Sequence, residues 1–244
     1  MILIAGFFIT ALLYASVGFG GGSTYNALLA LSGFDYRLLP IVSLACNIVV
    51  VSASTVQFAR AGVTPWRKAL TLSLLAAPAA FLGGLTPIRQ ETFLVVLGLS
   101  LVAAGLALLL PRAAEREQRP LPIARLAPVA AVPLGYLAGL VGIGGGIFFA
   151  PLLHLARWAG ARQIAATTAL FILINSVTGL LGQLAKSGPA AFGQAAAAHW
   201  PLLIAVIAGG QIGTHLAVRL LPERVIRWLT AALTVYAGSR LLLG

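Results

Sequence analysis

Charged residues are scarce in this chain, and acidic residues are the scarcest of them. Of its 244 residues, 9% are charged and only 5 are Asp or Glu, whereas 60% are hydrophobic. The mean hydropathy of +1.00 is higher than the core of a soluble domain requires. This composition excludes an ordinary soluble domain and predicts a protein that crosses a lipid bilayer several times.

The few acidic residues are all expected in connectors or at the ends of apolar segments. They are Asp35, Glu91, Glu115, Glu117 and Glu223. A cation carrier or a carboxylate proton relay needs an acidic side chain within the membrane. Because none is expected there, the sequence argues against both functions and favours an anion as the substrate.

Cysteine is almost absent as well, since Cys46 is the only one and lies inside an apolar run. A lone thiol forms no intramolecular disulfide and is a poor basis for a thiolate metal site. We therefore expect a buried, inert thiol and predict neither a metal nor another cofactor. The net charge of +11 is not accompanied by a basic helix face or an aromatic RNA-binding pattern, so no nucleic-acid partner is predicted.

The apolar residues form ten segments that polar connectors separate. They cover residues 2–17, 22–32, 40–59, 66–86, 92–110, 126–141, 146–158, 163–185, 196–218 and 225–243. The first segment lacks the positive flank and cleavage site of a signal peptide, so we expect it to be mature structure. The long segments approach the ~20 residues of a spanning helix. The predicted fold class is an all-α polytopic membrane protein.

A Val-Gly-x-Gly-Gly-Gly string occurs twice, at residues 17–22 and 141–146. We call these the first and second glycine strings. Asn47 and Asn175 recur in corresponding segments, which also indicates a duplication. The predicted parts are an N-terminal repeat (1–110), a polar cytoplasmic linker (111–125) and a C-terminal repeat (126–244). Five segments per half would give the second half the opposite orientation in the membrane, so the duplication is predicted to be an inverted repeat.

The 16 Lys and Arg residues divide unequally if the ten segments alternate across the membrane. Twelve fall on one side: Arg60, Arg67, Lys68, Arg112, Arg116, Arg119, Arg125, Arg157, Arg162, Arg219, Arg224 and Arg227. Four fall on the other: Arg37, Arg89, Lys186 and Arg240. Cytoplasmic loops are the ones enriched in Lys and Arg. Both termini are therefore predicted on the periplasmic or extracellular side.

The segments beside each glycine string are short. At ~1.5 Å per residue, segment 22–32 covers about half of a ~30 Å hydrocarbon layer. We therefore favour a re-entrant, glycine-rich helical hairpin at the start of each half. The predicted sidedness is the same for hairpins and for full spans, and the sequence leaves both arrangements open.

A helix that starts after each glycine string would present about four free N–H groups and a partial positive charge. Such helix starts bind anions. If the two tips meet near the membrane midplane, their amides point at a common ligand. The expected substrate-binding residues are Gly20, Gly21, Gly22, Ser23, Asn26, Asn47, Gly144, Gly145, Gly146, Thr168 and Asn175.

Structural alternatives exist for each of these features. Glycines in membrane helices also permit close helix contact, and Ser and Thr hydroxyls commonly bond to the preceding turn. Asn47 and Asn175 could be clamps between helices instead of substrate ligands. His154 and His215 lie inside apolar segments, where a satisfied or interfacial histidine is commoner than a proton carrier.

The membrane potential favours outward movement of an anion. An interior-negative potential contributes about 2.3 kcal/mol per charge per 100 mV, so an anion can leave without a coupled ion. Uptake driven by a steep gradient or by an unseen coupling ion is the alternative direction.

The two glycine strings, with Pro151 and Leu152 behind the second, resemble the TauE/SafE family of sulfite and organosulfonate permeases over essentially the whole chain. The first half departs from the family pattern, since Ala27 stands where the second has Pro151. The resemblance implies a transporter, not an enzyme, that carries sulfite, sulfoacetate or a related organosulfonate across the bacterial inner membrane, and the membrane potential favours export. It would act by alternating access.

Two other functional classes stay open at this stage. One is a passive anion channel or membrane scaffold. The other is an intramembrane hydrolase with Ser23 as nucleophile and His154 or His215 as base, which is weak because Ile147 occupies the matching position after the second string. The small anion and the lipid bilayer are the predicted partners. The oligomeric state is not predictable, because lipid-facing and subunit-facing surfaces are both apolar.

Overall fold

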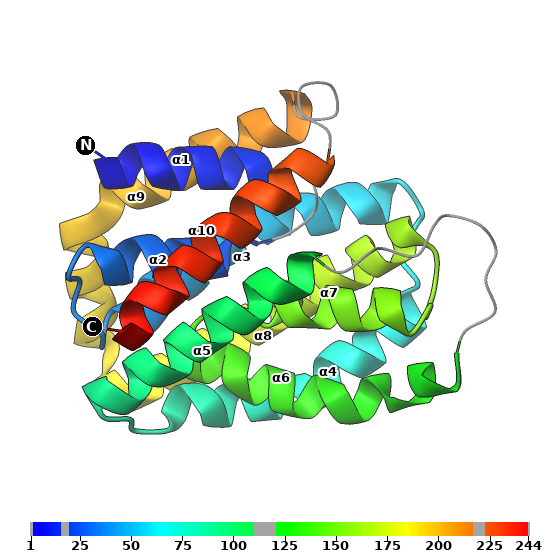
Figure 1. Cartoon of the computed structure of the whole chain (residues 1–244), viewed down its shortest axis with the longest axis horizontal. Helices are drawn as coiled ribbons and strands as arrows, with labels where there is room; N and C mark the ends of the chain where they lie inside the picture. Colours follow the sequence, from blue (N-terminus) through cyan, green and yellow to red (C-terminus); the bar gives the residue numbers. More distant parts are fainter. Residues whose placement is uncertain (1, 16–19, 110–120, 217–222, 244) are drawn as a thin grey trace.

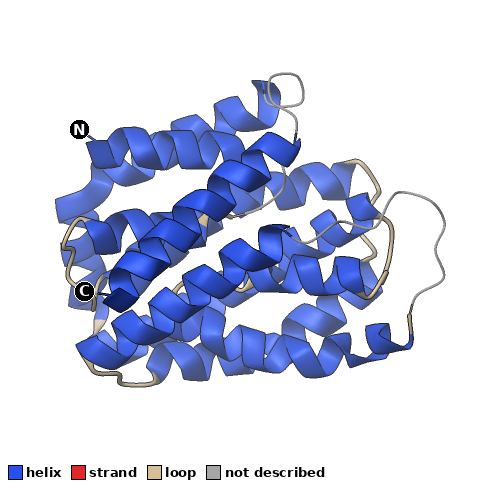
Figure 2. Ribbon diagram, in the orientation of Figure 1, coloured by secondary structure: helices blue, strands red, loops and turns tan. Residues whose placement is uncertain are grey.

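The computed structural model describes residues 2–15, 20–109, 121–216 and 223–243, and every regular element in these ranges is helical (Figure 2). The α-helices are α1 (Ile2–Ala15), α2 (Gly22–Leu31), α3 (Leu39–Arg60), α4 (Trp66–Leu85), α5 (Gln90–Leu109), α6 (Ala127–Val141), α7 (Gly146–Leu155), α8 (Ala161–Ser187), α9 (Pro189–Leu216) and α10 (Glu223–Leu243). A short 3-10 helix, η1 (Pro122–Leu126), precedes α6. The predicted all-α fold class is confirmed.

Each of the ten predicted segments corresponds to one α-helix. The largest difference is at α9, which starts at Pro189 where the sequence led us to expect a helix from residue 196. The region from 189 to 198 is rich in alanine, which forms helices well without being strongly apolar. α9 bends at His199, whose φ and ψ of -130° and 19° are non-helical, and Pro201 follows two residues later.

Five helical stretches are long and apolar enough to cross a membrane: Leu39–Arg60, Trp66–Leu85, Gln90–Leu109, Pro122–Val141 and Ala161–Ser187. The chain is therefore a multi-pass membrane protein. η1 and α6 together make 20 residues, so the sixth segment has the length of a full span. The short helices α2 and α7 each have 10 residues. That they belong to hairpins that re-enter the membrane from one side stays a prediction.

The helices pack mainly across the two predicted halves of the chain. α1 packs along α9, α4 contacts both α6 and α8, α5 packs along α10, and α3 contacts α8 (Figure 1). The pairs α1–α9 and α6–α4 are those that equivalent helices of two repeats would form. This pattern fits the predicted inverted repeat, and the predicted boundaries of the repeats are not tested by it.

Glycines permit the closest of these helix contacts. A Cβ on Gly83 of α4 would collide with the carbonyl of Tyr136 on α6, and one on Gly238 of α10 would lie 2.7 Å from the carbonyl oxygen of Gly98 on α5. Membrane helices associate through such small residues, because lipid leaves little hydrophobic driving force between them. Gly83, Gly98 and Gly238, which lie outside the two glycine strings, thus permit close contact between helices.

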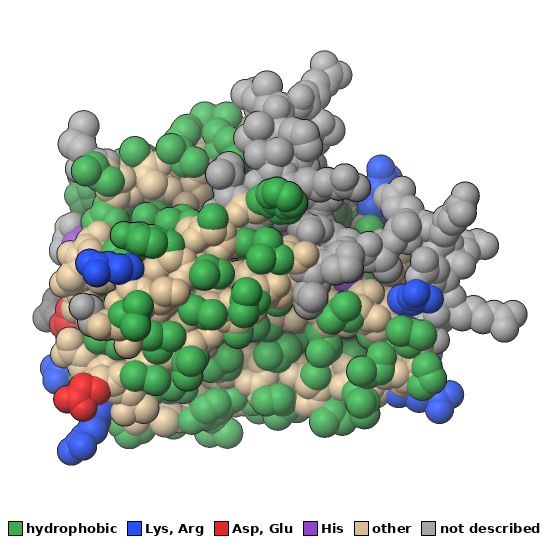
Figure 3. All heavy atoms as spheres, in the orientation of Figure 1, with side chains coloured by type: hydrophobic (Ala, Val, Ile, Leu, Met, Phe, Trp, Pro, Cys, Tyr) green, Lys and Arg blue, Asp and Glu red, His purple; other side chains and the backbone are tan. Residues whose placement is uncertain are grey.

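Hydrophobic side chains cover the middle of the molecule, and charged side chains lie toward its two ends (Figure 3). Large apolar residues on the lipid-facing sides of α4 and α5, such as Leu74, Leu82 and Leu99, are exposed. The N- and C-terminal ends lie at the same end of the bundle (Figure 1). Which end faces the cytoplasm stays a prediction.

Candidate functional site

The two glycine strings lead into α2 and α7 with the same backbone geometry. The residue before each helix, Gly21 or Gly145, has a left-handed conformation with φ of 74° or 76°. Neither helix start has a side-chain cap. Residues 17–19 of the first string lie outside the described ranges. Glycine is required at both positions because other residues rarely adopt this conformation.

Both helix starts leave backbone amides without a backbone acceptor. Among the described residues, the amides of residues 22–24 and of Gly146 and Ile147 have no backbone acceptor outside the helices. All of these residues are buried. Buried amides without partners are costly in a membrane, so each helix start is a candidate binding point for an anionic oxygen.

The first helix start lies directly against the second glycine string. A Cβ on Gly22 would lie 2.6 Å from the carbonyl oxygen of Ile143. Asn26, one turn into α2, donates its Nδ2 to the carbonyl of Val141 over 2.8 Å. The structure therefore brings the two strings together, and Asn26 links α2 to the end of α6.

Asn47 of α3 contacts both glycine strings. Its Nδ2 donates to the carbonyl of Ile143 over 3.2 Å, while its buried Oδ1 has no partner. A Cβ on Gly20 would lie 2.7 Å from Oδ1, and one on Gly144 would lie 2.9 Å from Nδ2. One polar side chain thus marks the point where the strings meet.

Apolar side chains fill the rest of this meeting point. A Cβ built on Gly20 would lie 3.1 Å from Cγ2 of Ile172 on α8, and one built on Gly144 would lie 2.9 Å from the same atom. The Cβ built on Gly20 would also lie 3.1 Å from Cγ1 of Val51 on α3. Ile172 was not predicted as a site residue, because an isoleucine in an apolar segment carries no sequence signal.

The glycines of the two strings face opposite ways. Gly20, Gly22, Gly144 and Gly146 face the cluster around Asn47 and Ile172. By contrast, a Cβ on Gly21 would meet Thr10 and the Tyr25 ring at 3.1 Å, and one on Gly145 would meet Ala138, the Leu134 carbonyl and Phe171 at 3.1 Å. The two left-handed glycines therefore shape the turns, while their neighbours line the site.

Asn175 does not mirror Asn47. Its Nδ2 donates within α8, to the carbonyl of Phe171 over 2.8 Å, and its buried Oδ1 has no partner. The next residue, Ser176, contacts the second string instead, with its Oγ 3.1 Å from a Cβ on Gly144. The structure thus brings Ser176 to the site more directly than the predicted Asn175.

Ser23 and Thr168 flank the two helix starts. Ser23 is buried in the first turn of α2. Thr168 of α8 has its methyl group 3.0 Å from a Cβ on Gly146, and its Oγ1 is buried without a partner. Ser43 of α3 donates to the carbonyl of Gly22 over 3.1 Å and so anchors the first helix start.

Buried polar atoms without partners lie along α3 and α8, some beside the strings and some farther along the helices. They are Ser54, Thr55, Thr168, Ser176 and the Oε1 of Gln183. Ser43, Asn47 and Ser54 follow the helical period on α3, and Thr168, Asn175 and Gln183 do so on α8. This spacing is the signal that could have identified Ser54, which our sequence analysis did not select.

The two histidines considered as proton carriers lie in α7 and α9. His154 is buried near the end of α7, and the side chain of His215 lies outside the described part of the chain. No group of three His, Cys, Asp or Glu side chains comes together within the described ranges. Cys46 is buried and not in a disulfide.

The chain matches the family described as "Sulfite exporter TauE/SafE" over residues 2–241. It is 35% identical to a probable membrane transporter protein of Sinorhizobium fredii, over 98% of this chain and 97% of that protein. A probable membrane transporter protein of Methanocaldococcus jannaschii is 24% identical over 75% of this chain and 72% of its own length. One of Xylella fastidiosa is 28% identical over 81% and 79%. No solved structure matches the chain significantly.

Proposed function

We propose that this chain, which belongs to the TauE/SafE sulfite exporter family, binds a small sulfur-containing anion between its two glycine strings and carries it across the membrane. Its family and the names of its relatives describe membrane transporters, so the chain is a transporter and not an enzyme. The anion we propose is sulfite, sulfoacetate or a related organosulfonate.

The observation that carries this proposal is that Asn47 touches both glycine strings where two uncapped helix starts converge. The free amides and the positive ends of two helix dipoles would act on the same ligand. A sulfite or sulfonate group has three oxygens and can accept several such hydrogen bonds. Because the donors are uncharged, they would hold the anion without trapping it.

The packing at the meeting point supports a carrier over a passive channel. Ile172 and Val51 fill the space beside Gly20, so the two strings are not separated by an open pore in this state. An anion could reach Asn47 only if α3 and α8 shift relative to the strings. Rocking of the two repeats against each other around a fixed site would provide that shift, which is the alternating-access mechanism.

Outward transport follows from the charge distribution that we predict. The interior-negative potential drives an anion out, and the larger predicted cytoplasmic set of Lys and Arg would raise its concentration at the entry side. We place the protein in the bacterial inner membrane with both termini on the periplasmic side. A reporter fused after residue 244 that is active only in the periplasm would test this orientation.

The test is flux into liposomes that contain the purified protein. Sulfite, sulfoacetate, taurine, thiosulfate and sulfate would be compared under an imposed membrane potential. We expect saturable transport of one or more sulfur anions, stimulated by substrate on the opposite side. Flux that does not saturate would favour a channel, and the absence of flux with every anion would refute the proposal.

A further inference from the structure

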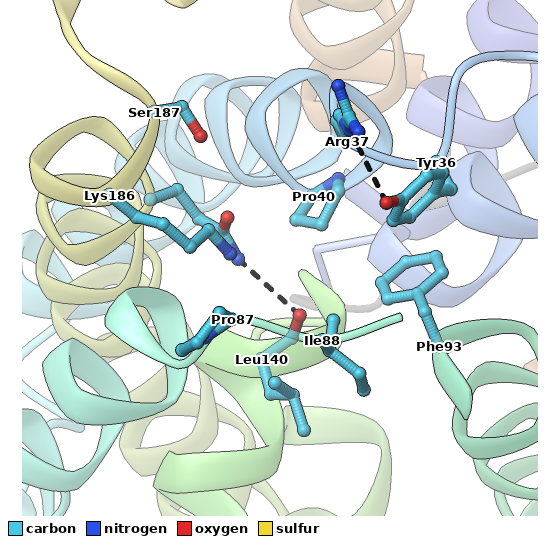
Figure 4. Close-up of a pocket in the computed structure, with 10 residues that line it drawn as sticks. Tyr36, Arg37, Pro40, Pro87, Ile88, Phe93, Leu140, Lys186 and Ser187 are labelled. Atoms are coloured by element: carbon cyan, nitrogen blue, oxygen red, sulfur yellow. Dashed lines mark hydrogen bonds between the residues drawn. The ribbon is translucent and has the colours of Figure 1, made fainter. Parts of the chain in front are cut away.

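A cavity lined by apolar and charged side chains lies beside the second glycine string, at the end of the bundle that holds both termini. Its volume is about 260 Å³. The loop before α3, the loop before α5, the end of α6 and the end of α8 form its walls. Figure 4 shows Lys186 and Ser187 on one side of the cavity and Tyr36 and Arg37 on the other.

The side chains that line this cavity include two cations. The Lys186 ammonium donates to the carbonyl of Thr86 over 3.3 Å, which leaves further N–H donors for a ligand. Arg37 donates its Nε to the Tyr36 hydroxyl over 3.3 Å, and this bond raises the pKa of the Arg37 guanidinium. Asp35 accepts a bond from the Arg37 backbone amide and offsets part of that charge. Lys186 is therefore the stronger attraction for an anion.

The cavity lies next to the second glycine string. Leu140 in its wall directly precedes that string, and Pro40, also in its wall, has its Cα 2.5 Å from a Cβ built on Gly142. Gln183 donates to the carbonyls of Gly139 and Leu140, and the second of these bonds is the dashed line that ends at Leu140 in Figure 4. The wall of the cavity is thus in contact with the start of the second glycine string.

We propose that this cavity is a second anion site, in which Lys186 and Arg37 hold a small sulfonate- or sulfite-type oxyanion at the outer end of the transport path. The inference rests on the proposed function for the identity of the anion, and it predicts a site that is occupied before or after the one between the strings. The cavity is large enough for a small organosulfonate.

A cysteine placed in the cavity wall would measure its charge directly. Ser187 is exposed and lines the cavity, and the native Cys46 is buried, so Ser187→Cys introduces a single accessible thiol. Its reaction with 2-sulfonatoethyl methanethiosulfonate is compared with its reaction with the trimethylammonium analogue in detergent-solubilised full-length protein. We expect the anionic reagent to react about tenfold faster relative to the cationic one than it does with free cysteine.

Lys186→Gln and Arg37→Gln, added to Ser187→Cys, should abolish this preference, with the larger loss for Lys186→Gln. Arg240→Gln is the matched control, because Arg240 lies in the last turn of α10 and not in the cavity wall. Sulfoacetate should slow the labelling in the Arg240→Gln background and not in the Lys186→Gln background. An unchanged preference in both cavity variants would overturn the inference.

Transport provides a second measurement in protein that keeps Ser187. Lys186→Gln should raise the KM for substrate supplied at the periplasmic face about tenfold and leave kcat near that of the native protein. If no sulfur anion is transported but the labelling preference holds, the proposed function fails while the anion cavity stands. If transport occurs with an unchanged KM and an unchanged labelling preference, the cavity inference fails alone.

Discussion

Replacing Asn47 by aspartate should abolish anion binding by charge alone. Asparagine and aspartate have nearly the same size, so Asn47→Asp places a carboxylate between the glycine strings with little steric change. Two like charges about 4 Å apart repel each other by ~4 kcal/mol at an effective dielectric constant of about 20. At 1.36 kcal/mol per tenfold change, this corresponds to a loss of affinity of about a thousandfold.

Asn47→Ala separates this charge effect from the loss of structure. Both variants lose the Nδ2 bond to the Ile143 carbonyl, and leaving that buried oxygen unpaired costs roughly 1–3 kcal/mol of stability. Asn47→Ala adds no charge, so we expect its affinity to fall much less than that of Asn47→Asp. The difference between the two variants therefore reports the distance from Asn47 to the bound anion.

The assay is calorimetric titration of purified, monodisperse protein with sulfoacetate, repeated as liposome flux. Lowering the pH should protonate the introduced carboxyl and restore part of the binding in Asn47→Asp but not in Asn47→Ala. Equal affinities for the two variants at high pH would mean that the anion does not bind beside Asn47. The proposed site would then be wrong, even if the protein transports sulfur anions.

Three further substitutions test the geometry of the strings. Gly20→Ala should lower transport several-fold, because its Cβ would lie 2.7 Å from Asn47 Oδ1, whereas Gly210→Ala has only a Val50 methyl group at 3.9 Å and should transport normally in the same flux assay. Gly21→Ala should lower the thermal unfolding temperature more than Gly62→Ala. Both substitutions add a side chain at positive φ, which costs roughly 1–2 kcal/mol of stability. Only the side chain added at Gly21 would also meet Thr10 and Tyr25. Equal temperatures would show that packing at Gly21 is unimportant. Ile172→Ala should improve competition by bulkier organosulfonates against sulfite, because it removes side-chain volume between the strings; unchanged selectivity would place the substrate elsewhere.

The helices were predictable from sequence because hydropathy and length are properties of a segment by itself. The predicted segment 66–86 and α4 (Trp66–Leu85) differ by one residue. The prediction was less accurate where helix formation and hydropathy diverge. η1 and the first turns of α9 are helical without being strongly apolar, and each begins at a proline, Pro122 or Pro189, that is compatible with a helix start.

The candidate site was predicted in outline and not in detail. Duplication drew attention to the glycine strings and to Asn47, which the structure brings together. The same argument favoured Asn175 equally, yet the side-chain amide of Asn175 donates a hydrogen bond within α8. Ser176 is the residue that lies beside Gly144 instead. A repeated sequence predicts equivalent positions along the chain, but a side chain's partner depends on which neighbour packs against it.

The sequence by itself determined that this is a multi-pass helical membrane transporter of the TauE/SafE family with two matching glycine strings, because composition, hydropathy and motif repetition are linear properties. Only the tertiary structure decided that Gly20, Gly22, Gly144 and Gly146 face Asn47 while Gly21 and Gly145 face away. Likewise, only the fold brings Ile172 between the strings and Lys186 to a cavity shared with Arg37. The direction that a glycine faces and the contacts between distant helices arise from packing, which no single segment encodes.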